Sequence, residues 1–363
     1  MDTPWGPLAD LDPANRELAF EILQSDKHQL LEGLVVENTF DQLVLPLTKA
    51  TPKHFVPLDV ATVVAQSDAG DHRYFFVWSQ SPKTATGLGR YLLALSRLGV
   101  VYLVAYTGTT FTAQCRPQGR SSSDIEPLHD LLRRLTGNNP SITDVDLTVR
   151  DRDRQMEAFW GYLSSTYPGR KLWDNVVLFR LLINHGIQPF FGAVWNLDRI
   201  CLFDDQLWML EVKHKYPFTS DRRLVVGLND GELSLMNELE RAGIQTLHAL
   251  IVKPVWSKDV GSMYLHSDMT MRERAVVIGL VMNRDRIDRI TGTRSGSSPS
   301  YTALTGRGQL SYKKIPVTEF GLLGAFSNGA QALSKNLEVL LEGGTLPAVT
   351  ERLLQNARAT ARP

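Results

Sequence analysis

Hydrophobic and polar positions in the first half of the chain change from strand spacing to helical spacing and back to strand. Residues 73–78 (RYFFVW) form a β-rich run, residues 84–98 have the spacing of a helix, and residues 100–106 (VVYLVAY) form a second apolar strand. This order predicts a βαβ unit with two parallel strands and a right-handed connection. Further helices are expected at residues 14–23 and 124–135.

In the second half the pattern changes after a break at residues 137–140 (GNNP). Two helices are expected first, then three short strands, then a helix stopped by Gly243 and a final apolar strand. The ranges are 151–162 and 173–184 for the helices, 187–194, 199–203 and 207–213 for the strands, 230–242 for the next helix and 246–252 for the last strand. A stretch rich in glycine and serine (291–314) and two helices (330–341 and 346–357) follow. The order helix, three strands, helix, strand predicts an α/β sandwich with a mixed sheet.

The length of the chain predicts two domains. At 363 residues it exceeds the roughly 100–200 residues of an ordinary domain. We expect a boundary between Gly137 and Arg150, with an N-terminal α/β domain in residues 1–140 and a C-terminal α/β domain with a helical extension in residues 150–363.

Composition narrows the class of protein without choosing a function. The chain is 43% hydrophobic and 21% charged, as folded globular proteins are. Its 39 basic and 39 acidic side chains cancel, so any site for a polyanion must be a local patch. Cys115 and Cys201 stand far apart in apolar stretches, which favours two buried thiols over a disulfide or zinc site. The first residues lack a basic region that leads into an apolar run, and no segment reaches the ~18–20 apolar residues that span a bilayer, so we expect a cytoplasmic protein with no membrane association.

Residues 197–213 predict a tight β-hairpin. Two apolar strands flank Asp204 and Asp205, and aspartates favour tight turns because their side chains bond the local backbone. If these two residues form the turn, Phe203 lies opposite Gln206, and the numbers of paired residues keep the same sum outward along the strands.

This register gathers ionisable side chains on one face of the hairpin. Asp198 lies opposite Glu211, and the strand period of two puts Lys213 on the same face. Two neighbouring carboxylates at a buried margin repel, and the repulsion is relieved by protonation of one of them, by a cationic partner or by a bound metal ion. Oxygen ligands suit Mg²⁺, and a nearby ammonium can orient an attacking water or stabilise charge on a phosphate. The alternative is that Asp198 caps a strand while Glu211 and Lys213 form an ordinary ion pair.

The segment from about residue 173 to 252 resembles the core of the PD-(D/E)xK nuclease superfamily. In that family, helix, three antiparallel strands, helix and strand follow one another, with an Asp at the start of the second strand and Glu-x-Lys at the end of the third. Asp198, Glu211 and Lys213 match these positions, although Leu197 replaces the motif's proline. The resemblance implies a restriction-endonuclease-like α/β/α core in which Asp198 and Glu211 bind Mg²⁺ or Mn²⁺ and Lys213 is catalytic.

Members of the family also place an acid on the first core helix, where it faces the same metal ion. Asp174 is the candidate for this third metal ligand, with Glu157 on the preceding helix as the second choice. The alternative for Asp174 is a charge that only stabilises a helix N-terminus. Because many members pair two sites to cut two strands, the resemblance also implies a homodimer.

The connection between the first predicted strand and helix contains a candidate anion site. Ser79, Ser81, Lys83 and Thr84 precede Gly87 at a helix N-terminus, where backbone N–H groups favour anions. The alternative is that these residues only form the turn and cap the helix. An N-terminal βαβ domain joined to such a nuclease is similar to ligand-sensing effectors of prokaryotic antiviral defence, which implies a small nucleotide activator. A specificity domain, as in restriction endonucleases, stays open.

Basic residues follow the hairpin and could contact a nucleic-acid backbone. His214, Lys215, Arg222 and Arg223 form this run, and a solvated loop explains it equally well. The glycine- and serine-rich stretch is a second candidate, because it carries basic and aromatic side chains that could contact phosphates and stack on bases. These residues are Arg294, Tyr301, Arg307, Tyr312, Lys313 and Lys314.

The sequence thus predicts a Mg²⁺- or Mn²⁺-dependent nuclease that hydrolyses phosphodiester bonds in DNA, RNA or both. The alternative is a non-catalytic nucleic-acid-binding or scaffold protein with a relic nuclease fold. Asp198, Glu211 and Lys213 in one register favour the enzyme, because a relic has no reason to keep all three.

Overall fold

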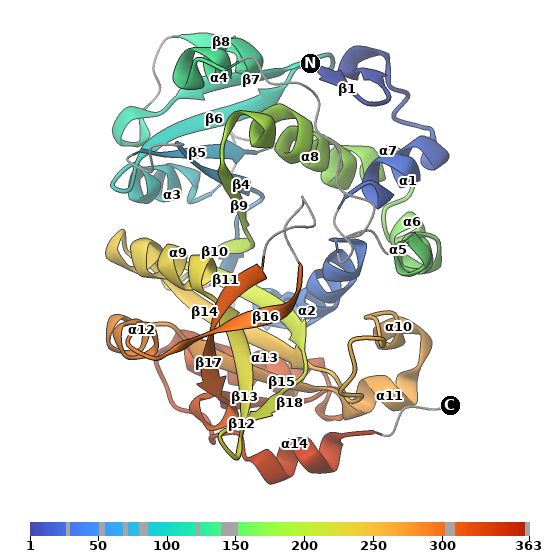
Figure 1. The fold of residues 1–363 in the computed structure, drawn as a ribbon, viewed down its shortest axis with the longest axis vertical. Helices are drawn as coiled ribbons and strands as arrows, with labels where there is room; N and C mark the ends of the chain where they lie inside the picture. The colour runs from blue at the N-terminus through green and yellow to red at the C-terminus, as the bar shows by residue number, and fades with distance from the viewer. Residues whose placement is uncertain are drawn as a thin grey trace.

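The computed structural model describes residues 1–26, 30–50, 55–67, 72–79, 86–120, 124–138, 152–301 and 309–359. Within these residues the fold is mixed α/β, as the sequence predicts, and it contains two six-stranded sheets, a four-stranded sheet and a short ribbon of β1 (Asp2–Thr3) and β2 (Gly6–Pro7) (Figure 1). We name the two six-stranded sheets the upper sheet and the lower sheet, from their places in Figure 1. No helix in the described ranges is both long and apolar enough to cross a bilayer.

The lower sheet has the strand order β18, β15, β14, β11, β10, β3, and its neighbours are antiparallel except for β11 and β14. These strands are β3 (Phe55–Pro57), β10 (Arg199–Phe203), β11 (Gln206–Lys215), β14 (Ile244–Val252), β15 (Val276–Val281) and β18 (Gly321–Ala325). Its central strands are apolar on both faces, as expected of a sheet interior. Helix α9 (Asp230–Arg241) packs on one face, while α2 (Leu30–Ala50) and α13 (Ala330–Leu341) pack on the other.

The upper sheet has the strand order β8, β7, β6, β5, β4, β9. The strands are β4 (Ala61–Gln66), β5 (Arg73–Trp78), β6 (Val100–Tyr106), β7 (Phe111–Cys115), β8 (Ile125–Pro127) and β9 (Ala193–Leu197). Strands β5 and β6 are parallel and are joined through α3 (Leu88–Leu95), so the predicted βαβ unit is confirmed. Helix α3 covers one face of the upper sheet. Helices from both predicted domains cover the other face, among them α1 (Arg16–Gln24), α4 (Leu128–Thr136) and α8 (Leu178–Leu181).

The four-stranded sheet lies in front of the lower sheet in Figure 1 and has the order β12, β13, β17, β16. Its strands are β12 (Phe218–Ser220), β13 (Arg223–Asn229), β16 (Ser295–Tyr301) and β17 (Gln309–Pro316). Two of these strands come from the glycine- and serine-rich stretch. Helix α12 (Arg284–Thr291) precedes β16, and α14 (Glu351–Ala357) ends the described chain.

The two large sheets do not divide at the predicted boundary between residues 137 and 150. Strand β3 precedes that boundary but belongs to the lower sheet, and β9 follows it but belongs to the upper sheet. One apolar core also runs from α3 to the hairpin of β10 and β11 and on to α9. Hydrophobic spacing predicts which segments are strands, but it does not predict which strands pair across a long separation in sequence.

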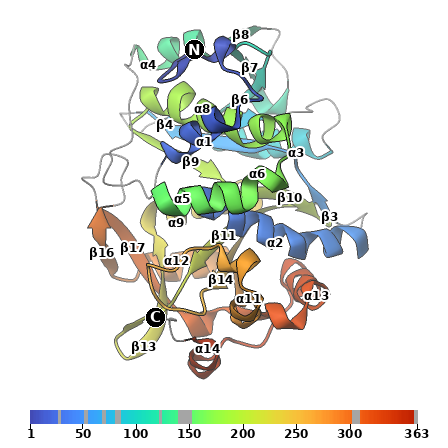
Figure 2. The ribbon, with the colours of Figure 1, turned by 90° about the vertical axis from the view of Figure 1, so that its right-hand side faces the viewer.

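The segment 173–194, which was expected to begin the nuclease-like core, lies beside the upper sheet instead. Residues 173–190 are helical, and β9 pairs with β4 rather than with β10. Besides β11, the neighbour of β10 is β3, and the helix that packs against β10 and β11 is α2, drawn in blue in Figure 2. The first helix and strand of the lower sheet therefore come from residues 30–57, before the upper sheet begins.

The hairpin has the predicted register. Phe203 pairs with Gln206, and the ladder continues outward to Arg199 opposite Leu210. Asp204 and Asp205 have φ values of 44° and 64°, so both turn residues are in the left-handed region that a type I′ turn requires. Asp198 is the next residue beyond this ladder.

The upper sheet and the helices that cover it are called the upper unit below. Helix α3 of this unit packs directly on the hairpin. The backbone of Gly87 has φ +83°, and a Cβ atom there would lie 2.3 Å from Leu202 Cδ1. Arg90 of the same helix forms an ion pair with Asp205 in the turn, at 3.1 Å. The absence of a side chain at Gly87 therefore allows α3 to approach β10 closely.

We predict that Gly87→Ala destabilises the protein by about 1–3 kcal/mol, because it combines overpacking with an unfavourable backbone conformation. Gly89→Ala is the matched control. A Cβ at Gly89 meets no atom within 4 Å, and alanine should stabilise the helix by about 0.5–1 kcal/mol. Urea unfolding curves of both variants measure these differences, and equal effects would contradict the close packing of α3 on β10.

Candidate functional site

Asp198 lies at the point where the chain passes from the upper sheet to the lower sheet. Leu197 pairs with Thr62 in the upper sheet, and Arg199 pairs with Leu210 in the lower sheet. A second connection runs beside it, because β3 leads into β4 and the Leu58 N–H donates to Ile200 O at 2.9 Å. The Asp198 side chain is only 7% exposed, and its Oδ1 accepts a hydrogen bond from Asn196 Nδ2 at 3.5 Å.

Lys213 brings the predicted residues of the hairpin together. Its Nζ forms an ion pair with Glu211 Oε1 and a second ion pair with Asp198 Oδ2 at 3.5 Å. Glu211 is also buried, with a side chain 7% exposed. The prediction that these three side chains meet on one face of the hairpin is therefore confirmed.

Glu232 is a further member of this cluster, and the sequence analysis missed it. Its Oε1 lies 3.7 Å from Lys213 Nζ, and it stands in the first turn of α9. Asn229 caps this helix, because its Oδ1 accepts hydrogen bonds from the N–H groups of Gly231 and Glu232. Since α9 connects the parallel strands β11 and β14, its first turn lies near the strand that carries Glu211. The crossover rule for parallel strands could have indicated this acid.

Glu37 on α2 approaches the cluster beside Asp198, and the sequence analysis also missed it. Burial and the charge of Asp198 raise the pKa of Glu37 to about 7. Its Oε2 lies 3.9 Å from an Arg199 guanidinium nitrogen, and Arg199 also pairs with Asp41 at 2.5 Å. Because α2 lies far from the hairpin in sequence, no local pattern indicated Glu37.

The carboxylates outnumber the positive charges that balance them. Burial, with the nearby charge of Asp198, raises the pKa of Glu211 to about 8. Burial lowers the pKa of Lys213, but the surrounding carboxylates outweigh it and hold that pKa well above its usual value. For Glu232 the charges of Lys213 and Lys215 outweigh burial and lower the pKa. The cluster is therefore short of positive charge when Glu211 is ionised, and a bound cation would favour that ionised form.

His248 lies on β14 in register with Glu211. It is fully buried, and burial together with the charge of Lys215 lowers its pKa to about 3. The ring is therefore neutral at ordinary pH.

Asp174 does not join the cluster, so its assignment as the metal-binding acid of the first core helix is wrong. It lies in η5 (Trp173–Val177), which packs with α8 beside the upper sheet, and it pairs with Arg170 at 3.4 Å. The charges that act on Glu211 are those of Asp198, Lys213 and Glu232. Glu157, the second choice, is an exposed residue of α5 (Arg152–Ala158). Helical spacing predicted these helices but not the sheet on which they pack.

The basic run after the hairpin does not form one patch. Burial lowers the pKa of His214 well below its usual value, and its ring bonds Tyr264 Oη at 2.9 Å. Lys215 Nζ donates to Gly227 O at 2.7 Å. Arg222 and Arg223 lie at the turn of β12 and β13, about 20 Å along β13 from Asn229 at ~3.3 Å per residue.

In the glycine- and serine-rich stretch, two lysines donate hydrogen bonds to other residues of the protein. Lys313 donates to the backbone oxygens of Thr291 and Thr293, and Lys314 donates to Ser220 Oγ. Tyr312 packs over the backbone of Gly227 and Gly296. Arg307 lies outside the described residues, and of Tyr301 only the backbone is described.

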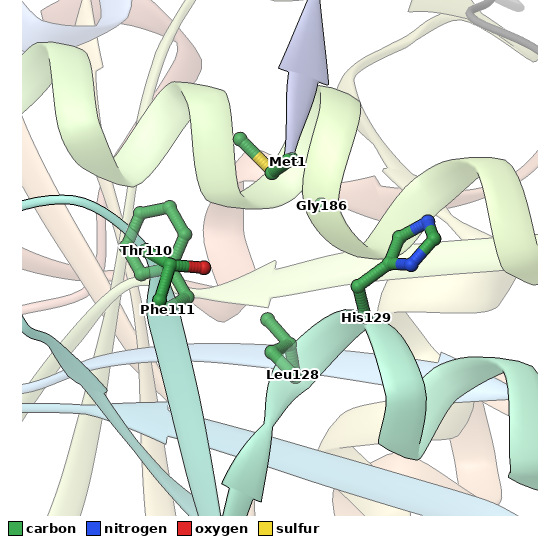
Figure 3. Close-up of a pocket in the computed structure, with 6 residues that line it drawn as sticks. All are labelled: Met1, Thr110, Phe111, Leu128, His129 and Gly186. Carbon is green, nitrogen blue, oxygen red and sulfur yellow. The ribbon is translucent and has the colours of Figure 1, made fainter. Parts of the chain in front are cut away.

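Of the candidate anion site, only Ser79 lies within the described residues. It is buried at the end of β5, with 3% of its surface exposed. Ser81, Lys83 and Thr84 lie outside the described residues. A small hollow elsewhere in the upper unit carries no carboxylate or lysine; it is lined by Met1, Thr110, Phe111, Leu128, His129 and Gly186 (Figure 3).

Comparison with known proteins finds no matching family model, no matching curated protein and no matching solved structure. The arrangement of Asp198, Glu211, Lys213 and Glu232 therefore has to be judged on its own geometry.

We predict that Glu211→Gln gains stability relative to the wild type as pH rises from about 5 to about 9 in the presence of a chelator. The pKa of Glu211 rises on folding from 4.5 to about 8, so its contribution is fully present below pH 4.5 and is lost as pH rises through about 8. Glutamine does not ionise, so the variant does not lose stability in this way as pH rises. The expected change is on the order of 1–3 kcal/mol, measured by urea unfolding across the pH range.

Glu342→Gln, which removes an exposed acid at the end of α13, serves as the control. A stability difference between wild type and Glu211→Gln that stays constant with pH would contradict the raised pKa.

Proposed function

We propose that this protein is a Mg²⁺- or Mn²⁺-dependent nuclease that hydrolyses phosphodiester bonds in DNA, RNA or both. The observation that carries the proposal is the meeting of Asp198, Glu211 and Lys213 at one end of the β10–β11 hairpin. Two buried carboxylates beside an ammonium are suited to holding a divalent cation and a phosphate together.

The order of elements in the lower sheet supports the same proposal. Within the lower half, helix α2 is followed by the antiparallel strands β3, β10 and β11 and then, after β12 and β13 of the four-stranded sheet, by α9 and the parallel strand β14. This is the order of the PD-(D/E)xK core, with residues 58–197 inserted between its first and second strands. We therefore propose a restriction-endonuclease-like core in the lower half, with the upper sheet as a regulatory or targeting unit.

The chemistry of the donor groups fits a hard divalent cation. Asp198 Oδ2 and Glu232 Oε2 are buried oxygens that accept no hydrogen bond from the described residues. No cluster of three or more acids, histidines or cysteines within the described ranges has the spacing of a complete metal site. Mg²⁺ does not require one, because it keeps several waters and is commonly held by one or two carboxylates. Asp198 and Glu211 would hold the ion.

The residues of the cluster divide the chemistry of hydrolysis between them. When bound, the ion would activate a water and neutralise charge on the phosphate. Lys213 places its ammonium beside both carboxylates, where it can stabilise the negative charge that develops on the phosphate oxygens. Glu37 approaches Asp198 from α2 and takes the role first given to Asp174, that of the acid on the core helix.

The wider biological role is part of the proposal. The resemblance to defence effectors suggests a cytoplasmic protein that a nucleotide activates through the upper unit, and pairing of two sites would require a homodimer. A nucleic acid is the proposed substrate, and a non-catalytic binding protein is the alternative that the following assay tests.

We predict metal-dependent cleavage of plasmid, single-stranded DNA or RNA, which EDTA abolishes. The variants Asp198→Asn, Glu211→Gln and Lys213→Met should each lower the rate by about a hundredfold to a thousandfold, because each removes either a proposed ligand of the cation or the ammonium beside the phosphate. Cleavage is followed on gels with Mg²⁺ and Mn²⁺. If no substrate is cut under any condition, or if the variants cut as well as the wild type, the enzyme proposal fails.

We also predict that Glu37→Gln lowers the cleavage rate by about tenfold to a hundredfold, while Asp174→Asn leaves it unchanged. Both variants replace one ion-paired acid on a helix with its amide, but only Glu37 lies close enough to Asp198 for the two charges to interact. Rates at saturating Mg²⁺ provide the measurement. Equal losses in the two variants would argue against Glu37 as the acid of the core helix.

A further inference from the structure

Lys213 contacts acids from three separate places in the fold. Glu211 is on its own strand, Asp198 is at the junction of β9 and β10, and Glu232 is on α9. The proposed cation would use Asp198 and Glu211, which are two of these three partners. A cation held there would therefore compete with the Lys213 ammonium for both carboxylates.

The ammonium needs another partner once those two carboxylates hold a cation. A charge that is largely removed from water is costly without a counter-ion, and the Lys213 backbone is fixed in β11, so its flexible side chain must find a new partner nearby. Glu232 Oε1 is already 3.7 Å away from it. The other carboxylate oxygen of Glu232, Oε2, is buried and accepts no hydrogen bond from the described residues.

Neighbouring residues hold Glu232 in position to pair with the Lys213 ammonium. The cap formed by Asn229 orders the first turn of α9, and Lys215 is engaged by Gly227 O. On the same turn, Asp230 Oδ2 accepts hydrogen bonds from Ser295 and Ser311 of the four-stranded sheet. The carboxylate of Glu232 is therefore carried on a helix end that is anchored from two sides.

We propose that Glu232 is a positioning residue. When a divalent cation occupies Asp198 and Glu211, the Lys213 ammonium pairs with Glu232 instead, and we call this change of partner the exchange. The inference rests on the proposed function. In the free protein Lys213 neutralises the carboxylates of the site, and in the metal-bound protein it turns to Glu232 with its ammonium beside the substrate phosphate. The exchange lets the same lysine stabilise the empty site and then act in the loaded one.

A double-mutant cycle on metal binding tests the exchange without any measurement of cleavage. Mn²⁺ affinity is measured by calorimetry, in the absence of nucleic acid, for wild type, Glu232→Gln, Lys213→Met and the double variant. The exchange predicts that Glu232→Gln weakens Mn²⁺ binding by about tenfold when Lys213 is present, and by no more than about twofold in the Lys213→Met background. Lys213→Met alone should bind Mn²⁺ more tightly than wild type, because the competing ammonium is gone.

The other outcomes separate the possible failures. If Glu232→Gln weakens binding equally in both backgrounds, Glu232 is a direct ligand or acts through its field alone, and the exchange is wrong. If it has no effect in either background, the exchange is also wrong. If neither the wild type nor Lys213→Met binds Mn²⁺, the proposed function itself fails.

Glu240→Gln, which removes another acid from α9, is the matched control and should leave the affinity unchanged in both backgrounds. Glu232→Ala provides the same comparison if the glutamine variant does not fold.

Discussion

The partly buried ammonium of Lys213 pairs with carboxylates that belong to different parts of the fold, and the geometry of the candidate site depends on this pairing. Lys213 contacts acids from the strand β11, from the junction of β9 and β10, and from the helix α9. Burial of charge weakens a fold unless the charges are well paired. Groups with strongly shifted pKa values, such as Glu211, gather at functional sites more often than elsewhere. The unfavourable free energy of burying these charges is therefore an argument that the cluster has a function.

The position of Asp198 links the site to the whole molecule. The residue before it belongs to the upper sheet and the residue after it belongs to the lower sheet. A second strand connection, between β3 and β4, runs beside it, and α3 packs on the hairpin that carries Glu211. Asp198 therefore lies on one of two adjacent connections between the two sheets, and its position depends on both of them.

Local features of the fold could be predicted from sequence, and distant pairings could not. The turn at Asp204 and Asp205 and the alternation of the flanking strands together determine the register, so the meeting of Asp198 with Glu211 was predictable. The choice between residues 30–57 and 173–194 as partners of the hairpin was not, because both segments are apolar and helical or β-rich. Glu37 shows the consequence, since it reaches the site from a helix that no local pattern connects to the hairpin.

The charges that remain near the hairpin limit how this site could attract a polyanion. His214 is neutral because it is buried, Lys215 is engaged by the backbone of β13, and Arg223 begins β13 at the end away from α9. The positive charge beside Asp198 and Glu211 then comes mainly from Lys213 and from the cation that the carboxylates are proposed to hold. Because burial raises the pKa of Glu211 to about 8, this acid is largely protonated at neutral pH, and the site carries less negative charge than its number of acids suggests. Metal binding and substrate binding would still be coupled, because a bound cation adds positive charge to the field that a phosphate encounters.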